Sequence, residues 1–229
     1  MSLWQLVLLI ALSLPAGSIA RSLIERGPTD LPLFGSLRPL RPGGGEVLTQ
    51  LMLSAGFVAI GLRPGDRSVG VLLGLLAAFT VLVALAMIDI ATYRLPDRIV
   101  LPSLCAAIVW ITTVSLLDGH PDHVRSALAG AVVYFGVLLL AHLISPRGMG
   151  FGDVKFAALL GLLLGWIAPS VLDAVVLVLW AMLIGFAVGT TVGLLLLVRR
   201  RSNRPFPFGP FLALGTVVAL LCSARLVGT

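Results

Sequence analysis

The sequence predicts an all-α membrane protein, a polytopic bundle of about eight transmembrane helices. Apolar residues make up 59% of its 229 residues and charged residues only 11%, whereas about 25% of the residues in soluble domains are charged. Apolar stretches close to the ~20 residues that cross a bilayer recur along the chain. Short clusters of Arg, Asp, Pro and Gly separate them. One helical membrane domain can therefore account for nearly all of the sequence.

Eight spans can be drawn in order along the chain, and the second and sixth are short. They lie at about 3–20, 48–62, 68–90, 99–117, 127–145, 154–168, 171–198 and 209–227. The segment 21–47 is rich in Pro, Gly and Arg and has no periodic pattern, so we expect it to be irregular. We interpret residues 1–62 as an amino-terminal two-span region with a short loop, and residues 63–229 as the main membrane domain.

The basic residues predict the orientation of these spans. An amino terminus outside places the loops 21–47, 91–98, 146–153 and 199–208 in the cytoplasm. With Lys155 at the end of a span, these loops carry twelve of the sixteen Lys and Arg residues. This asymmetry follows the positive-inside rule and would reverse with one span more or fewer. We therefore attribute the net charge of +6 to membrane orientation and not to nucleic-acid binding.

Two aspartates lie where a charge is costly. Asp89 follows the apolar run 81–88 in the third span, and Asp153 follows the Gly-rich run 148–152 and opens the sixth span. An acidic residue beside lipid costs a few kcal/mol on insertion scales and needs a reason. The topology brings both to a similar depth at the cytoplasmic side, where they could form a pair. Taken singly, Asp89 could extend to the interface from a helix end, and Asp153 could be a helix cap.

A pair of carboxylates can hydrolyse a peptide bond without a metal or a cofactor. One takes a proton from water while the other, protonated, polarises the scissile carbonyl. Like charges close together cannot both ionise readily, so the pair shares a proton. We expect Gly150 and Gly152 to let the backbone approach closely, since a side chain there would intrude. Asp97, in a turn or cap, and Lys155, beside Asp153 or at the lipid interface, are candidate supporting residues.

Two other classes of protein fit an acidic pair in a membrane. A secondary transporter or proton-linked carrier would use Asp89 and Asp153 to bind ions near the bilayer midplane. Carriers usually contain internal repeats, however, and the sequence has no second copy of its Gly-rich Asp segment. The second alternative is an inactive scaffold derived from a peptidase, which the intact aspartates disfavour.

Three strings in order along residues 85–215 resemble one known family. They are Ile88-Asp89 with Arg94-Leu95-Pro96-Asp97, then Gly148-Met149-Gly150-Phe151-Gly152-Asp153-Val154-Lys155, then Pro207-Phe208-Gly209-Pro210-Phe211. Together they resemble the type IV prepilin peptidases, membrane aspartic peptidases of the Gly-x-Gly-Asp kind. The resemblance implies that Asp89 and Asp153 are the catalytic aspartates and that Asp97 is an acidic family position. It also implies removal of the leader of prepilins or pseudopilins at the cytoplasmic face of the bacterial inner membrane.

The amino-terminal part departs from the full-length pattern of this family. Longer members carry a cytoplasmic loop with two zinc-binding Cys pairs, which is associated with N-methylation by S-adenosylmethionine. The 21–47 loop has no cysteine; Gly17-Ser18, Leu31-Pro32-Leu33-Phe34 and Glu46-Val47-Leu48-Thr49 resemble remnants of that region. The resemblance therefore predicts a short form with peptidase activity, with N-methylation in doubt and neither zinc nor S-adenosylmethionine assigned. Preflagellin-type, tight-adherence and competence branches remain open.

Overall fold

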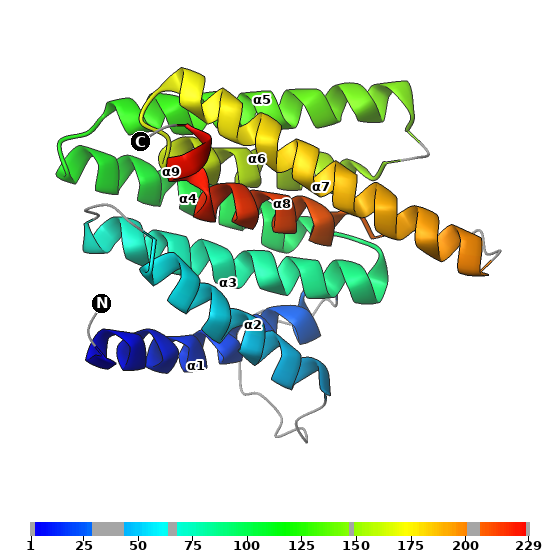
Figure 1. Ribbon diagram of the computed structural model, residues 1–229, viewed down its shortest axis with the longest axis horizontal. Coiled ribbons are helices and arrows are strands. Elements are labelled where there is room, and N and C mark those ends of the chain that lie inside the picture. The colour runs from blue at the N-terminus through cyan, green and yellow to red at the C-terminus, as the bar shows by residue number, and fades with distance from the viewer. Residues whose placement is uncertain (1–2, 29–43, 64–67, 147–148, 201–206, 228–229) are drawn as a thin grey trace.

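A computed structural model describes residues 3–28, 44–63, 68–146, 149–200 and 207–227. Within these ranges the chain forms nine helices and no strand, which confirms the predicted all-α bundle (Figure 1). The helices are α1 (Leu3–Arg26), α2 (Gly44–Gly61), α3 (Val69–Thr92), α4 (Asp97–Leu117), α5 (Asp122–Ile144), α6 (Phe151–Trp166), α7 (Val171–Arg200), α8 (Gly209–Leu221) and α9 (Ser223–Leu226).

Five of these helices, α1, α3, α4, α5 and α7, are long and apolar enough to cross a membrane. The apolar helices α2 and α8 are shorter, and α6 has 16 residues. Many large apolar side chains, such as Leu117, Ile144 and Val198, are exposed on the outside of the bundle. Such a surface suits lipid, because lipid tails carry no penalty for apolar contact.

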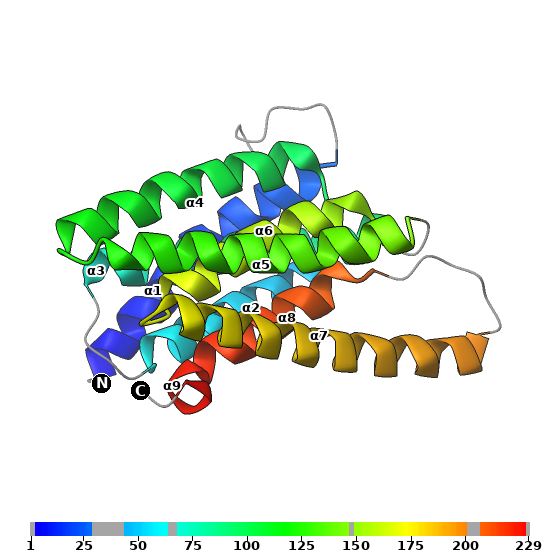
Figure 2. The ribbon, with the colours of Figure 1, turned by 90° about the horizontal axis from the view of Figure 1, so that it is seen from above.

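Helix α3 lies in the middle of the bundle. It packs against α1 and α2 on one side and against α4 and α8 on the other (Figure 1), and helices such as α5 and α6 lie over it when the bundle is seen from above (Figure 2). Its second half is an almost continuous buried apolar run that includes Leu82, Leu85 and Ile88. A helix that is apolar on all sides is stable only when other helices or lipid surround it. The fold therefore holds the last turn of α3, which contains Asp89, inside the bundle.

The closest helix pair, α5 and α6, is built on small residues. Gly161 and Gly165 of α6 face the backbone of α5, and a Cβ on either would overlap the carbonyl oxygen of Gly130 or Ser126. A Gly-x-x-x-Gly spacing puts both glycines on one helix face, which lets two membrane helices approach closely. The packing fixes α6 against α5 and so positions the first turn of α6, which carries Asp153.

Two segments differ from the sequence-based expectation. The first helix continues through Arg26 instead of ending near residue 20, because Arg21 and Glu25 form an i,i+4 ion pair (2.8 Å) on the added turn. The last predicted span is divided: α8 ends at Leu221, and α9 follows, where the Ser223 hydroxyl accepts a hydrogen bond from Arg63 (2.5 Å). At the other end of the predicted irregular segment α2 begins at Gly44, so residues 44–47 are helical too, and residues 29–43 lie outside the described ranges.

Candidate active site

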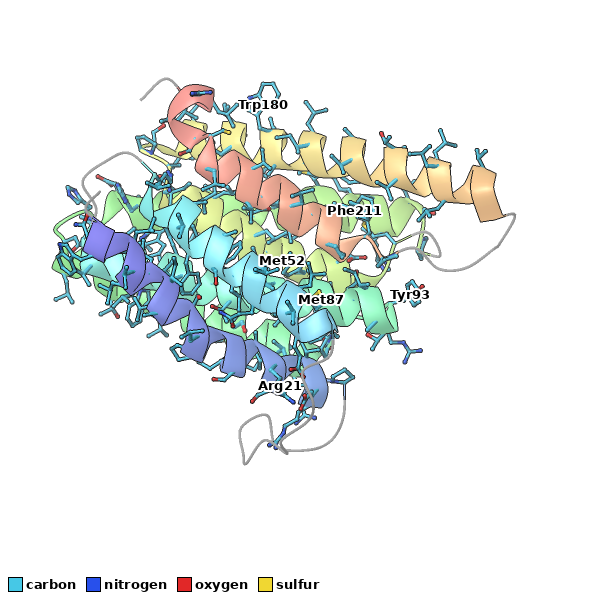
Figure 3. The ribbon with its side chains drawn as sticks, turned by 60° about the horizontal axis from the view of Figure 1, so that its bottom comes forward. Arg21, Met52, Met87, Tyr93, Trp180 and Phe211 are labelled. Carbon is cyan, nitrogen blue, oxygen red and sulfur yellow. The ribbon has the colours of Figure 1, made fainter. Side chains whose placement is uncertain are left out.

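Asp89 lies in the last turn of α3 and is buried, with 4% of its surface exposed. The helix ends three residues later at Thr92, where Tyr93 adopts the left-handed conformation (φ 56°) and donates its backbone N–H to the carbonyl of Asp89 (2.8 Å). A left-handed residue at this position is a common way to end a helix, although a non-glycine residue adopts it at some cost. Figure 3 labels Tyr93 at this end of α3.

A second acidic residue, Asp97, follows the turn from α3 to α4. Pro96 precedes α4 with an extended backbone, and Asp97 is the first helical residue, so it is not itself the cap. The Asp97 carboxylate forms an ion pair with Nζ of Lys155 in the first turn of α6 (2.7 Å). Lys155 therefore pairs with Asp97 and not with Asp153, and the pair joins the starts of α4 and α6.

Asp153 is the third residue of α6 and is half-buried. Gly150 takes the cap position, so the interpretation of Asp153 as the cap is wrong. The end of α5 supports this segment: Nδ1 of His142 hydrogen-bonds the carbonyl of Met149 (2.8 Å), and its ring lies 5.4 Å from that of Phe151. Gly148, part of the same string, lies outside the described residues.

The glycines of this string differ in their need to be glycine. A Cβ on Gly152 would lie 3.2 Å from Cβ of Leu95, so the neighbour would have to give way, as expected. A Cβ on Gly150 would remain 3.5 Å from the nearest atom, Oδ2 of Asp153, an ordinary van der Waals distance. The expectation that a side chain would intrude is thus met at Gly152 and wrong at Gly150.

The first turn of α8 completes the surroundings of Asp89. The backbone N–H of Gly209 donates a hydrogen bond to Oδ2 of Asp89 (3.0 Å) in the buried interior. In Figure 3, Phe211 marks the first turn of α8, at the same end of the bundle as Tyr93. The two residues of this hydrogen bond are 120 positions apart in the sequence. The fold therefore brings Gly209 of the third string into contact with Asp89 of the first.

One cavity of about 990 Å³ opens onto both aspartates. All six candidate site residues from the sequence line it: Asp89, Asp97, Gly150, Gly152, Asp153 and Lys155. Burial, and then the nearby charge of Asp89, raise the pKa of Asp153 to about 7, against a smaller lowering effect of the Gly150 backbone. Asp153 lies in the first turn of α6, outside the five candidate spans. A carboxyl group in this state can hold a proton near neutral pH beside a second carboxylate.

A second cavity of about 670 Å³ lies between α1, α2 and α3. Its polar lining is built around Arg21, which pairs with Glu25 (2.8 Å) and Glu46 (3.1 Å). Figure 3 shows Arg21 and Met87, both of which line this cavity. No pair of aspartates lies here. Throughout the described ranges, no three His, Cys, Asp or Glu side chains gather in a way that could hold a metal ion.

Sequence reasoning missed three features of the site. These are the Gly209 amide on Asp89, the left-handed Tyr93, and the hydrogen bond of His142 to the Gly-rich segment. Only the first had a signal: Gly209-Pro210 is a helix-start pattern, since proline is favoured in the first turn. Nothing in the sequence indicated which carboxylate that helix start would meet.

The apolar helices and the comparisons with known proteins together define a multi-pass membrane protein. Residues 76–194 match the type IV leader peptidase family, and the chain belongs to that family. It is 39% identical over 181 residues to a prepilin leader peptidase/N-methyltransferase of Aeromonas hydrophila, covering 77% of this chain and 56% of the relative. It is 35% identical to the Escherichia coli K12 protein of that name (62% of this chain, 60% of the relative).

The chain thus matches little more than half of the length of these relatives. A third relative of the same name, from Burkholderia pseudomallei, is 34% identical over 197 residues. The match covers 83% of this chain and 59% of the relative. No solved structure matches the chain. Family membership confirms the resemblance drawn from the three strings, and the comparisons do not support the carrier alternative.

Proposed function

We propose that this protein is an aspartic endopeptidase that removes the leader of type IV prepilin or pseudopilin precursors. The observation that carries the proposal is the single cavity onto which Asp89 and Asp153 both open. The family and the name of the relatives, prepilin leader peptidase, support the same chemistry. The substrates are therefore membrane-held pilin-type precursors of a pilus or protein-secretion system, and the protein meets them within membrane lipid.

The pair would perform the reaction with proton transfers alone. One carboxylate takes a proton from a water molecule as the water oxygen bonds to the scissile carbonyl carbon, and the other gives its proton to the carbonyl oxygen. The tetrahedral diol then collapses: the carbon–nitrogen bond breaks, the nitrogen receives the first proton, and the second carboxyl group recovers its own from a hydroxyl. Both aspartates return to the starting state, and no metal or cofactor takes part.

The positions of the basic residues support a site at the cytoplasmic face of the bacterial inner membrane. In the sequence, most of the Lys and Arg residues fall in 21–47 and in the segments that follow α3, α5 and α7 or begin α6. Basic loops remain in the cytoplasm. Asp89 and Asp153 lie at this end of their helices, which supports a cavity at the inner surface.

The proposal covers leader removal and does not include N-methylation. In the longer proteins that this sequence resembles, methylation is associated with two Cys pairs in one loop. Cys105 lies in α4 and Cys222 follows α8, and the 21–47 segment contains neither. The two cysteines are thus in different parts of the chain.

The test is leader removal in cells that co-express a prepilin processed by one of the relatives. We expect Asp89→Asn and Asp153→Asn each to reduce cleavage by at least about a hundredfold, because asparagine cannot exchange the proton. Asp97→Asn serves as the control: 56% of the Asp97 side chain is exposed, so loss of its ion pair costs at most about 1 kcal/mol. Cleavage is read from the mobility of the precursor at equal enzyme levels. Wild-type cleavage by either of the first two variants would contradict the proposal.

A further inference from the structure

The hydrogen bond between the backbone of Gly209 and Asp89 uses the spare donor of a helix start. The first backbone N–H groups of any helix lack partners within the helix. In α8 the N–H groups of Phe211 and Leu212 both reach the carbonyl of Phe208 (3.1 and 3.3 Å), and Pro210 has no N–H. The N–H of Gly209 is the donor that is left, and it points to Oδ2 of Asp89 (3.0 Å).

This contact requires glycine at position 209. A Cβ there would lie 2.9 Å from Oδ2 of Asp89, 3.4 Å from its Cγ and 3.4 Å from Cδ1 of Leu95. The first of these distances is shorter than real Cβ contacts, so an added methyl group would displace the carboxylate. The backbone of α8 thus approaches Asp89 as closely as glycine allows.

We propose that Gly209 is a positioning residue for catalysis: its amide orients the Asp89 carboxylate and favours its ionised form, so that Asp89 takes the proton from water. Asp153 is then the member that carries the shared proton and polarises the carbonyl. This inference rests on the proposed peptidase function. Two effects of α8 favour the ionised form of Asp89, the hydrogen bond from Gly209 and the positive end of the α8 dipole, and both oppose the desolvation of this buried carboxylate.

The surroundings of Asp153 fit the complementary role. Asp153 lies in the first turn of α6, where burial and then the charge of Asp89 outweigh the Gly150 backbone and raise its pKa to about 7. Lys155, which lies two residues after Asp153 in α6, forms its ion pair with Asp97. The other titratable groups that line the cavity with the two aspartates are Tyr93, Arg94, Asp97, Arg98 and Lys155.

The test compares Gly209→Ala with Gly45→Ala by measuring cleavage of a purified prepilin in detergent across pH. Gly45 is also in the first turn of a helix, and a Cβ there meets nothing within 4 Å. We expect Gly209→Ala to lower kcat about tenfold, the effect of losing a hydrogen bond to a charged group, with KM changed less than about twofold. Because the ionised form of Asp89 loses its donor, the acid limb of the kcat profile should move to higher pH. Gly45→Ala should match wild type.

A second pair of variants distinguishes an effect of position 209 on the Asp89 carboxylate from an effect on packing. If Gly209→Ala fails to accumulate, the double variant with Leu95→Ala is compared with Leu95→Ala alone, because removing the Leu95 contact at 3.4 Å gives the displaced groups room to shift. The same loss of kcat and shift of the acid limb would support the proposal. An unchanged acid limb would overturn it, and so would failure of both Gly209 variants to accumulate, which would assign this glycine to packing.

The outcomes also distinguish this inference from the proposed function. If Asp89→Asn and Asp153→Asn are inactive while Gly209→Ala behaves as Gly45→Ala does, only the role of Gly209 is wrong. If the two asparagine variants cleave as wild type does, the peptidase mechanism itself is wrong.

Discussion

Glycine permits close approach both at the α5–α6 interface and at the cavity with Asp89 and Asp153, but the neighbours differ. Between α5 and α6, Gly130, Gly161 and Gly165 face backbone atoms of the other helix. At the cavity, Gly209 faces the side chain of Asp89, and Gly152 faces Cβ and the backbone of Leu95, which lies in the turn between α3 and α4. The backbone of a helix cannot move without moving the helix, whereas a side chain can rotate and a turn between two helices can shift. Substitutions in the first region should therefore cost stability, and those in the second should cost activity.

The largest expected effect is at the α5–α6 interface. Gly161→Val would drive two methyl groups into the backbone of Gly130, and we expect a loss of about 3 kcal/mol, the upper part of the range for overpacked cores. Thermal unfolding in detergent measures the loss. Gly136→Val in α5, where an added Cβ meets nothing within 4 Å, is the matched control. Equal unfolding temperatures for the two variants would remove the basis of the comparison.

At the cavity, Gly152→Ala should reduce cleavage about tenfold and leave the unfolding temperature within about 2 °C of wild type. The added methyl group would press on Leu95 at 3.2 Å and shift the turn that carries Asp153. Gly150→Ala, with its nearest neighbour at 3.5 Å, should cleave at close to the wild-type rate. If Gly150→Ala lost more activity than Gly152→Ala, the close approach at Gly152 would not explain why glycine is needed in this segment.

The smallest effect concerns pH and needs no substitution. The pKa of Asp153 is raised to about 7, so its proton is kept below that pH and lost above it. A pair that must share one proton should then lose activity as pH rises, by about fivefold between about pH 7 and about pH 8. Initial rates with saturating prepilin, checked for recovery after return to pH 7, measure this. A rate that rises over the interval would contradict a protonated Asp153.

The fold could be predicted almost entirely from the sequence, because hydropathy and loop charge are properties of each segment alone. The two departures depend on particular side chains: the Arg21–Glu25 pair extends α1, and the last span is interrupted before Ser223. The sequence also predicted that Asp89 and Asp153 would lie together, since the drawn spans put both at a similar depth on one side of the membrane, and both line one cavity. It could not predict contacts across long separations, such as Gly209 with Asp89 or Lys155 with Asp97, because spacing carries no information about them.

Leu95 sits between the glycines of two helix starts, Gly152 of α6 and Gly209 of α8. Protein interiors are packed without spare volume, so this one uncharged side chain acts as a spacer that sets how near the two starts can come. A shorter residue would leave a gap, and a longer one would push the starts apart. The distance between the two acidic groups thus depends on the size of the Leu95 side chain as well as on charge.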